Sequence, residues 1–216
     1  MRYLSQEQVA GREKTLLSAL LLSAWAPLAT GLAVMLSFST TQMADFIRRC
    51  VELSALFVSW WIFRRLARHR ELSSEERARL EKVAAISISA ALCCSGIALL
   101  LLALSRFSTF KPGGNVYPGL AVAVLGFITN LWFWRRYTRL TGEQYNLIID
   151  AQRRLYRAKS FVDFCVIAAL GAVAVNPFHL LTRYIDLSGA IALAIYLFWS
   201  GIDTAYSSRR VPAGDF

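Results

Sequence analysis

The chain has 216 residues, of which 56% are hydrophobic and 18% are charged, and its formal net charge is +10. The apolar residues stand in long continuous blocks, whereas a soluble domain of this size spreads them at helical or strand period. This arrangement excludes an ordinary soluble globular domain and predicts a protein that lies in a membrane.

Six apolar blocks follow one another along the chain. A helix needs about 20 apolar residues to span ~30 Å of hydrocarbon, and the blocks predict helices at about residues 15–38, 43–66, 80–106, 116–140, 155–175 and 185–204. The second and the fifth reach this length only with charged residues inside them. We therefore predict an all-α fold: a six-helix transmembrane bundle over residues 12–206, with no soluble domain and a short cytoplasmic tail at 207–216.

The basic residues are distributed unevenly between the two sides of this predicted bundle. Of the 24 lysines and arginines, eighteen fall on one side, in the amino-terminal segment, the segments 64–82 and 135–157, and the tail. Only Arg106, Lys111 and Arg183 fall on the other side. Cytoplasmic loops carry the excess of Lys and Arg, so we expect both termini in the cytoplasm and the bundle in a bacterial inner membrane. Anionic lipid accounts for the charge, and nucleic acid is not expected as a partner.

No motif of an enzyme or of a cofactor site is found. The sequence has no nucleophile–base motif, no phosphate-binding loop and no dinucleotide fingerprint. The four cysteines fall inside predicted helices, without the spacing of a structural zinc site. We therefore expect neither an enzyme nor a bound cofactor.

Charged residues inside the second predicted helix share one face. Asp45, Arg48, Arg49 and Glu52 are spaced i, i+3, i+4 and i+7. An ionisable group at membrane depth costs ~2.5–3.5 kcal/mol on insertion scales, so it is retained only where a partner or water is near. The spacing therefore predicts a polar face that points into the bundle.

The fifth predicted helix repeats this pattern, with Lys159 four residues before Asp163. Within one helix a cation before an acid is the poorer order for an ion pair. We therefore predict pairs across the two helices, Arg48 with Asp163 and Lys159 with Glu52. Two interpretations stay open: the pairs only hold the helices together, or they serve transport or a proton relay.

The third predicted helix has small residues at Ser87, Ala91 and Ser95, with Gly96 beside them. Small residues at this spacing allow helices to approach closely in lipid. We interpret them first as a packing surface, and only secondarily as a dimerisation surface.

Several short motifs stand in an order that matches a known family. The second helix opens with Ala44-Asp45, and the segment before the third ends in Arg79-Leu80-Glu81. The fourth helix holds Asn130, and the sixth is entered through Ile185-Asp186-Leu187-Ser188-Gly189. In order and spacing these motifs resemble the membrane domain of the cation diffusion facilitator (cation efflux) family, whose members have six helices with both ends in the cytoplasm.

The resemblance implies four transport-site positions, which are Arg48, Glu52, Lys159 and Asp163. In the family the corresponding residues hold a divalent metal such as zinc. An arginine has no lone pair to offer, and a lysine has none until it loses its proton. Only Glu52 and Asp163 remain as metal ligands, so tight zinc binding is not expected. Second-rank candidates along the same path are Asp45, Arg49 and Asn130.

By resemblance, the function is that of a membrane transporter that moves a cation, a divalent metal in the family, in exchange for protons. The alternative is a non-transporting relative that acts as a membrane scaffold or partner subunit, its metal site replaced by Arg/Lys–carboxylate pairs. A homodimer and a heteromer both stay open for either function. A third possibility is a transporter of an anionic or organic solute held by Arg48 and Lys159. About a dozen residues follow Thr204, so the family's carboxyl-terminal cytoplasmic domain is not expected.

Overall fold

Every regular element of the described chain is an α-helix. The computed structural model describes residues 6–37, 40–68, 73–108, 117–175 and 180–210. The helices are α1 (Gln6–Ser37), α2 (Thr40–Arg68), α3 (Ser74–Ser108), α4 (Tyr117–Glu143), α5 (Leu147–Val175) and α6 (Leu180–Arg210). The predicted all-α fold with six helices is confirmed.

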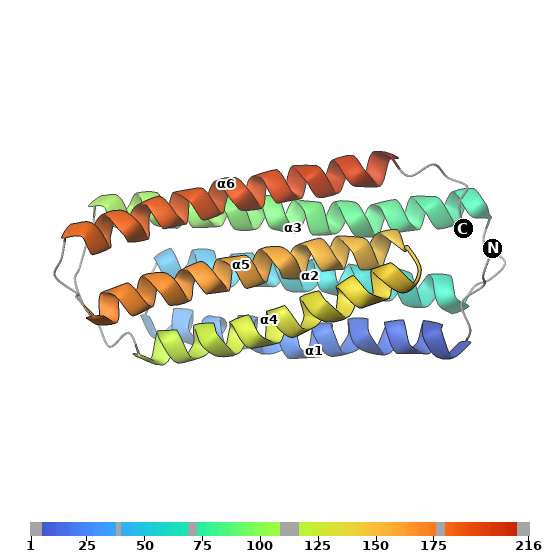
Figure 1. The fold of residues 1–216 in the computed structure, drawn as a ribbon, viewed down its shortest axis with the longest axis horizontal. Helices are drawn as coiled ribbons and strands as arrows, with labels where there is room; N and C mark the ends of the chain where they lie inside the picture. Colours follow the sequence, from blue (N-terminus) through green and yellow to red (C-terminus); the bar gives the residue numbers. More distant parts are fainter. Residues whose placement is uncertain (1–5, 38–39, 69–72, 109–116, 176–179, 211–216) are drawn as a thin grey trace.

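The helices lie side by side along one long axis and alternate in direction (Figure 1). The most extensive contacts are those of α3 with α6 and of α4 with α5, followed by those of α2 with α3 and of α1 with α2. Because the directions alternate, the first residues of α1, α3 and α5 lie at the same end as the last residues of α2, α4 and α6. We call this the basic end, since Arg12, Arg64, Arg136, Arg153 and Arg154 are found there.

The helices extend beyond the predicted apolar blocks, mainly at the basic end. α3 begins at Ser74 rather than at about residue 80, and Ser73 and Glu76 form a capping box in which the Glu76 amide donates to Ser73 Oγ at 3.2 Å. α5 begins at Leu147 rather than at 155. Its first amides, from Ile148 and Ile149, donate to Asn146 Oδ1 at 3.1 and 3.2 Å. Apolar composition therefore located the middle of each helix, and polar caps set the beginnings of α3 and α5.

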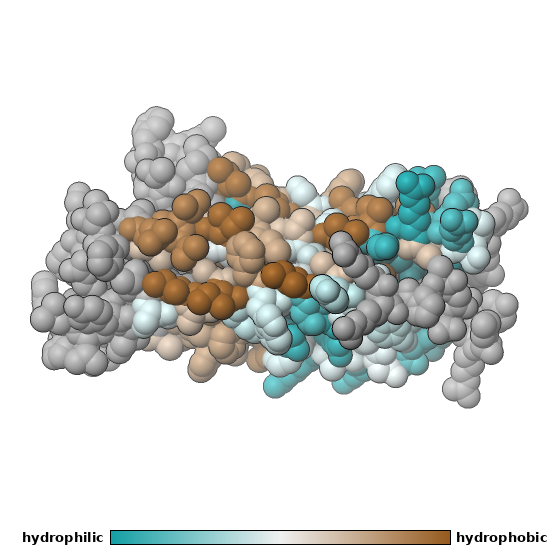
Figure 2. Space-filling model, turned by 90° about the horizontal axis from the view of Figure 1, so that it is seen from above, coloured by the Kyte–Doolittle hydropathy of each residue, from teal (hydrophilic) through white to brown (hydrophobic). Residues whose placement is uncertain are grey.

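The surface divides along the long axis (Figure 2). On the face that Figure 2 shows, hydrophobic residues cover the middle of the molecule and extend away from the basic end, while most hydrophilic residues lie toward the basic end. Large apolar side chains are well exposed in this region; Trp25 is 73% exposed, Leu125 66% and Ile195 65%. Contiguous exposed apolar surface of this kind marks contact with lipid or with another protein.

By length and composition, one helical stretch of the described residues is long and apolar enough to cross a membrane, Ser74–Leu101 of α3. A single stretch is weak evidence, since the core helix of a soluble protein can have the same properties. α2 and α5 carry charged residues inside their apolar stretches, as the sequence indicated.

α3 and α6 approach each other closely at two glycines. A methyl group on Gly201 would lie 2.6 Å from Cys93 Sγ, and one on Gly96 would lie 3.0 Å from the Ala194 carbonyl oxygen. The Ser89 hydroxyl donates to the Gly201 carbonyl at 2.6 Å. Gly96 belongs to the small-residue surface predicted on the third helix, and this part of it packs on α6.

Candidate functional site

An ion pair joins α2 to α5 inside the bundle. Lys159 Nζ lies 3.0 Å from Glu52 Oε2, and the side chains are only 14% and 12% exposed. Each residue lies near the midpoint of its helix. The predicted pair between Lys159 and Glu52 is therefore present, and a buried ammonium neutralises a buried carboxylate.

The Glu52 carboxylate is also held by α3 and by its own helix. The Ser95 hydroxyl donates to Glu52 Oε1 at 2.9 Å, and Arg48 Nη1 lies 3.7 Å from the same oxygen. On the other side of the pair, Lys159 Nζ lies 5.4 Å from the centre of the Tyr156 ring, within reach of a cation–π interaction. The sequence predicts Ser95 only as a packing residue, and its hydrogen bond to Glu52 is a finding of the structure.

Asp163 is held by α4. Asn130 Nδ2 donates to Asp163 Oδ2 at 2.6 Å, and Gly126, one turn before Asn130, faces the same carboxylate. A methyl group on Gly126 would lie 3.3 Å from Asp163 Oδ2. Asn130, a second-rank candidate from the sequence, thus lies in the first contact layer of this carboxylate.

The predicted pair between Arg48 and Asp163 is wrong. Among the ion pairs of the described residues, Arg48 contacts Glu52 one turn along its own helix, and Asp163 has no cation within ion-pair distance. The physical reason is that Asn130 supplies the hydrogen bond that Asp163 needs, while Glu52 accepts both neighbouring cations. Of the other second-rank candidates, Arg49 is partly buried on α2, and the side chain of Asp45 lies outside the described residues.

The site thus holds two carboxylates and an amide around a lysine. Within the part of the chain that the structure describes, no three or more His, Cys, Asp or Glu side chains come together as a metal cage. Tetrahedral zinc takes four N, O or S donors. Here the Glu52 carboxylate, which could bind such an ion, is already paired with the ammonium of Lys159. A metal cargo could use Glu52 and Asp163 only after Lys159 moves or loses its proton.

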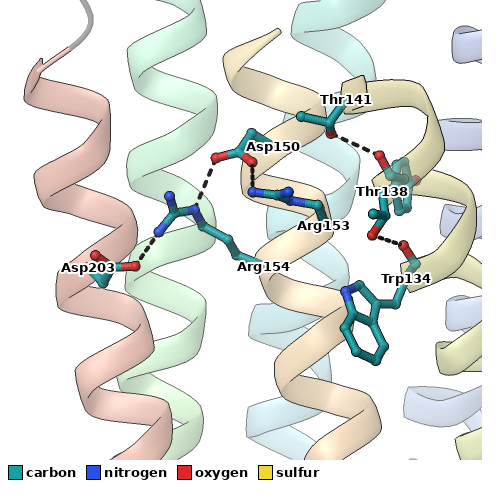
Figure 3. A network of polar contacts seen from close by, with 8 residues as sticks. Trp134, Thr138, Thr141, Asp150, Arg153, Arg154 and Asp203 are labelled. Carbon is teal, nitrogen blue, oxygen red and sulfur yellow. Dashed lines mark hydrogen bonds and ion pairs between the residues drawn. The ribbon is translucent and has the colours of Figure 1, made fainter. Parts of the chain in front are cut away.

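A second polar network fixes the basic ends of α5 and α6 (Figure 3). Asp150, only 4% exposed, contacts Arg153 Nη2 at 2.5 Å and accepts from Arg154 Nε at 3.0 Å. Arg154 also pairs with Asp203 of α6. Burial lowers the pKa of Arg154, but the hydrogen bond and the attraction to Asp150, with the attraction to Asp203, raise this pKa above its usual value. We interpret this network as a structural link between α5 and α6 rather than as a binding site.

α1 is fixed to α4 by one buried arginine. Arg12, 1% exposed, donates through Nη2 to the carbonyl oxygens of Leu140 and Gln144, at 3.0 and 3.1 Å. These carbonyls belong to the end of α4, where a helix has unpaired acceptors and a cation is favourable. In the sequence, Arg12 indicates only topology, since no spacing rule connects residues so far apart in the chain.

Comparison with known proteins adds one match. The family model described as the cation efflux transmembrane domain matches residues 16–211, which is nearly the whole chain and includes every residue of the site. No curated protein matches the chain.

Proposed function

The chain belongs to the cation efflux family, and on this premise we propose that it is a multi-pass membrane transporter that moves a cation through the site around Glu52, Lys159 and Asp163 in exchange for protons. The membrane setting follows from the family. The cargo, its charge and the coupling to protons are the proposal.

The observation that carries the proposal is the buried ion pair between Glu52 and Lys159, with the Asp163–Asn130 pair one turn further along α5. Charged groups at mid-bundle depth are costly, and in membrane proteins they mark ion pathways and proton relays. Four helices contribute to this one cluster, α2, α3, α4 and α5. A cluster that four helices share is well placed to respond when the helices move against one another.

Charge balance suggests how a cation would be exchanged for a proton. With Lys159 protonated, its ammonium neutralises Glu52 and the site holds no cargo. When the ammonium gives up its proton, the nitrogen gains a lone pair and Glu52 is released. A divalent cation could then bind the Lys159 nitrogen and the carboxylates of Glu52 and Asp163. Release of the cargo would let Lys159 take up a proton again and restore the ion pair.

The orientation is part of the proposal. Most basic residues lie at one end of the bundle, and an excess of Lys and Arg marks the cytoplasmic side. We therefore place the basic end in the cytoplasm, next to anionic lipid headgroups. The exposed apolar surface away from that end would then face the hydrocarbon of the bilayer (Figure 2).

One observation favours a second function, that of a non-transporting relative. Glu52 is satisfied by Lys159 and Ser95 without any ligand. A lysine that never loses its proton would make the ion pair a permanent link between α2 and α5. Such a protein would act as a membrane scaffold or as a partner subunit.

Flux into proteoliposomes separates the two functions. Purified protein is reconstituted, and uptake of zinc, cobalt or manganese is measured together with the internal pH. A transporter gives uptake with proton movement in the opposite direction, abolished by Asp163→Ala and retained in Glu75→Gln, which removes an exposed carboxylate at the basic end. Vesicles that stay inert with every cation would favour the scaffold.

A further inference from the structure

A column of polar side chains follows the inward face of α5 from the basic end to the site. Gln152, Tyr156, Lys159 and Asp163 are spaced i, i+4, i+7 and i+11, so they share one face of the helix. Gln152 and Tyr156 are both 0% exposed. The last two residues of the column belong to the site described above, and the first two lie between that site and the basic end.

Gln152 is the member of the column whose polar atoms the protein leaves unused. Neither Nε2 nor Oε1 has a hydrogen-bond partner among the described residues. A buried amide that makes no hydrogen bond is unfavourable, and buried polar groups in folded proteins pair with protein atoms or with water. The amide of Gln152 can both donate and accept, so water is a suitable partner at this position.

α2 brings a second polar group to the depth of Gln152. α2 and α5 run in opposite directions and are joined at Glu52 and Lys159 (Figure 1). Ser59 lies seven residues from Glu52 toward the basic end, and Gln152 lies seven residues from Lys159 toward the same end. Seven residues are about 10 Å along each helix. Ser59 is 0% exposed and donates only to Ala55 O of its own helix, so its oxygen can still accept a hydrogen bond.

Polar groups continue the column on both sides of Gln152. Nearer the site, the Tyr156 hydroxyl shares a hydrogen bond with Ser23 of α1 at 3.2 Å. Toward the basic end, Glu81 of α3 is buried, and its Oε2 has no hydrogen-bond partner within the described ranges. Its other oxygen, Oε1, accepts from Asn146 at 3.3 Å. Polar groups thus occur at several depths between the basic end and the site.

We propose that Glu81, Ser59, Gln152 and Tyr156 line a hydrated route by which water and protons pass between the basic end and Lys159. This inference rests on the proposed function, because that mechanism needs a path for the proton that Lys159 loses and regains. Gln152 is the central residue of the route. It holds water about midway between Glu81 and Lys159, where the neighbouring buried residues of α5 are mostly apolar.

Cysteine accessibility tests the route in a variant whose four native cysteines are replaced by alanine. Gln152→Cys is compared with Ala151→Cys, which lies at the same depth and is 2% exposed but points about 100° away around the helix. Membrane vesicles are treated from the cytoplasmic side with a small charged methanethiosulfonate that does not cross lipid. We expect Gln152→Cys to react about ten-fold faster, since only a thiol in contact with water ionises readily.

Equal rates at the two positions, or no reaction at Gln152→Cys in protein that elutes as folded, would overturn the proposal. If Gln152→Cys does not fold, Ser59→Cys decides instead, because it exchanges one oxygen atom for sulfur. The labelling uses no cation gradient, so it is independent of transport. Labelling without flux would reject the proposed function and keep the hydrated route, whereas flux without labelling would reject only the route.

Discussion

Lys159 Nζ lies 3.0 Å from Glu52 Oε2, and through this contact a charge on α5 is balanced by a charge on α2. Both side chains are mostly buried, so neither charge is well screened by water. Removal of either partner leaves the other as an uncompensated charge inside the bundle. The stability of the bundle and the charge of the site therefore both depend on the ion pair between Lys159 and Glu52.

A double-mutant cycle should reveal this coupling. Lys159→Met and Glu52→Gln should each lower the free energy of unfolding, by between ~1 kcal/mol, as for polar pairs in membranes, and ~3 kcal/mol, as for buried pairs. The double variant should lose less than the sum of the two, measured by thermal unfolding in detergent. Lys82→Met, which removes an exposed lysine, serves as the control. Additive losses would mean that the two residues are not coupled.

The hydrogen bond from Asn130 to Asp163 should matter in the same way. Asn130→Ala removes the donor from a largely buried carboxylate, and a hydrogen bond to a charged group contributes about 1.5–3 kcal/mol. We expect a loss of this order in chemical unfolding, together with reduced flux. Thr129→Ala is the matched control, since the Thr129 hydroxyl bonds only to Leu125 O of its own helix. Equal effects of the two substitutions would contradict the assignment.

The close approach of α3 and α6 predicts a steric effect at Gly201. In Gly201→Ala the new methyl group meets Cys93 Sγ at 2.6 Å and Ser89 O at 3.0 Å. Overpacking of this kind costs about 1–3 kcal/mol, which thermal unfolding would detect. Gly142→Ala has nothing within 4 Å of the added carbon and should be neutral or slightly stabilising. A tolerated Gly201→Ala would show that the two helices can separate freely at this point.

The two aspartates of the network at the basic end should differ in importance. Asp150 is 4% exposed and faces two arginines, so Asp150→Ala should cost about 2–3 kcal/mol. Asp203 is 43% exposed, so Asp203→Ala should cost at most about 1 kcal/mol. Unfolding at low and high salt provides the check, because salt screens the exposed pair more strongly. The reverse order of the two losses would refute this account of the network.

Zinc binding by the unmodified protein should be weak at neutral pH and should strengthen as the pH rises. The reason is that Lys159 must lose its proton before its nitrogen can bind a metal, and metal binding then releases protons. Calorimetry in buffers of different ionisation enthalpy measures both affinity and proton release. Arg48→Asp combined with Lys159→His would provide four donors and should bind zinc more tightly. A micromolar site in the unmodified protein at neutral pH would contradict this prediction.

The sequence predicted the number, order and type of the helices, because long apolar blocks permit little else. It did not predict their ends. α3 continues as a helix through charged residues before Val83, where the capping box of Ser73 and Glu76 starts it in a polar setting. Hydropathy reports contact with lipid, whereas a helix end is decided by hydrogen bonds to its first amides and last carbonyls.

The site was only partly predictable for a similar reason. Spacing identifies the face of a helix, so Glu52 and Lys159 could be placed toward each other from their positions in α2 and α5. The partner of Asp163 could not be found in this way, because it comes from a third helix, and Asn130 carries no charge to draw attention. The column through Gln152 and Tyr156 does follow from spacing, and it would have been found by extending the pattern of Lys159 and Asp163 toward the start of α5.

If the site carries a cation as proposed, the position of Lys159 also determines how that cation must compete for Glu52. An amine attached to the same chain faces Glu52 at an effective concentration of millimolar order or higher, whatever the surrounding solution contains. A monovalent cation from solution therefore meets a competitor that never diffuses away, and its apparent dissociation constant is raised accordingly. A divalent cation has the advantage of a second charge, with Asp163 one turn further along α5 as a further ligand. In such a transporter the tethered amine would set a threshold: below a certain free cation concentration, Glu52 would stay paired with Lys159 and no cargo would bind.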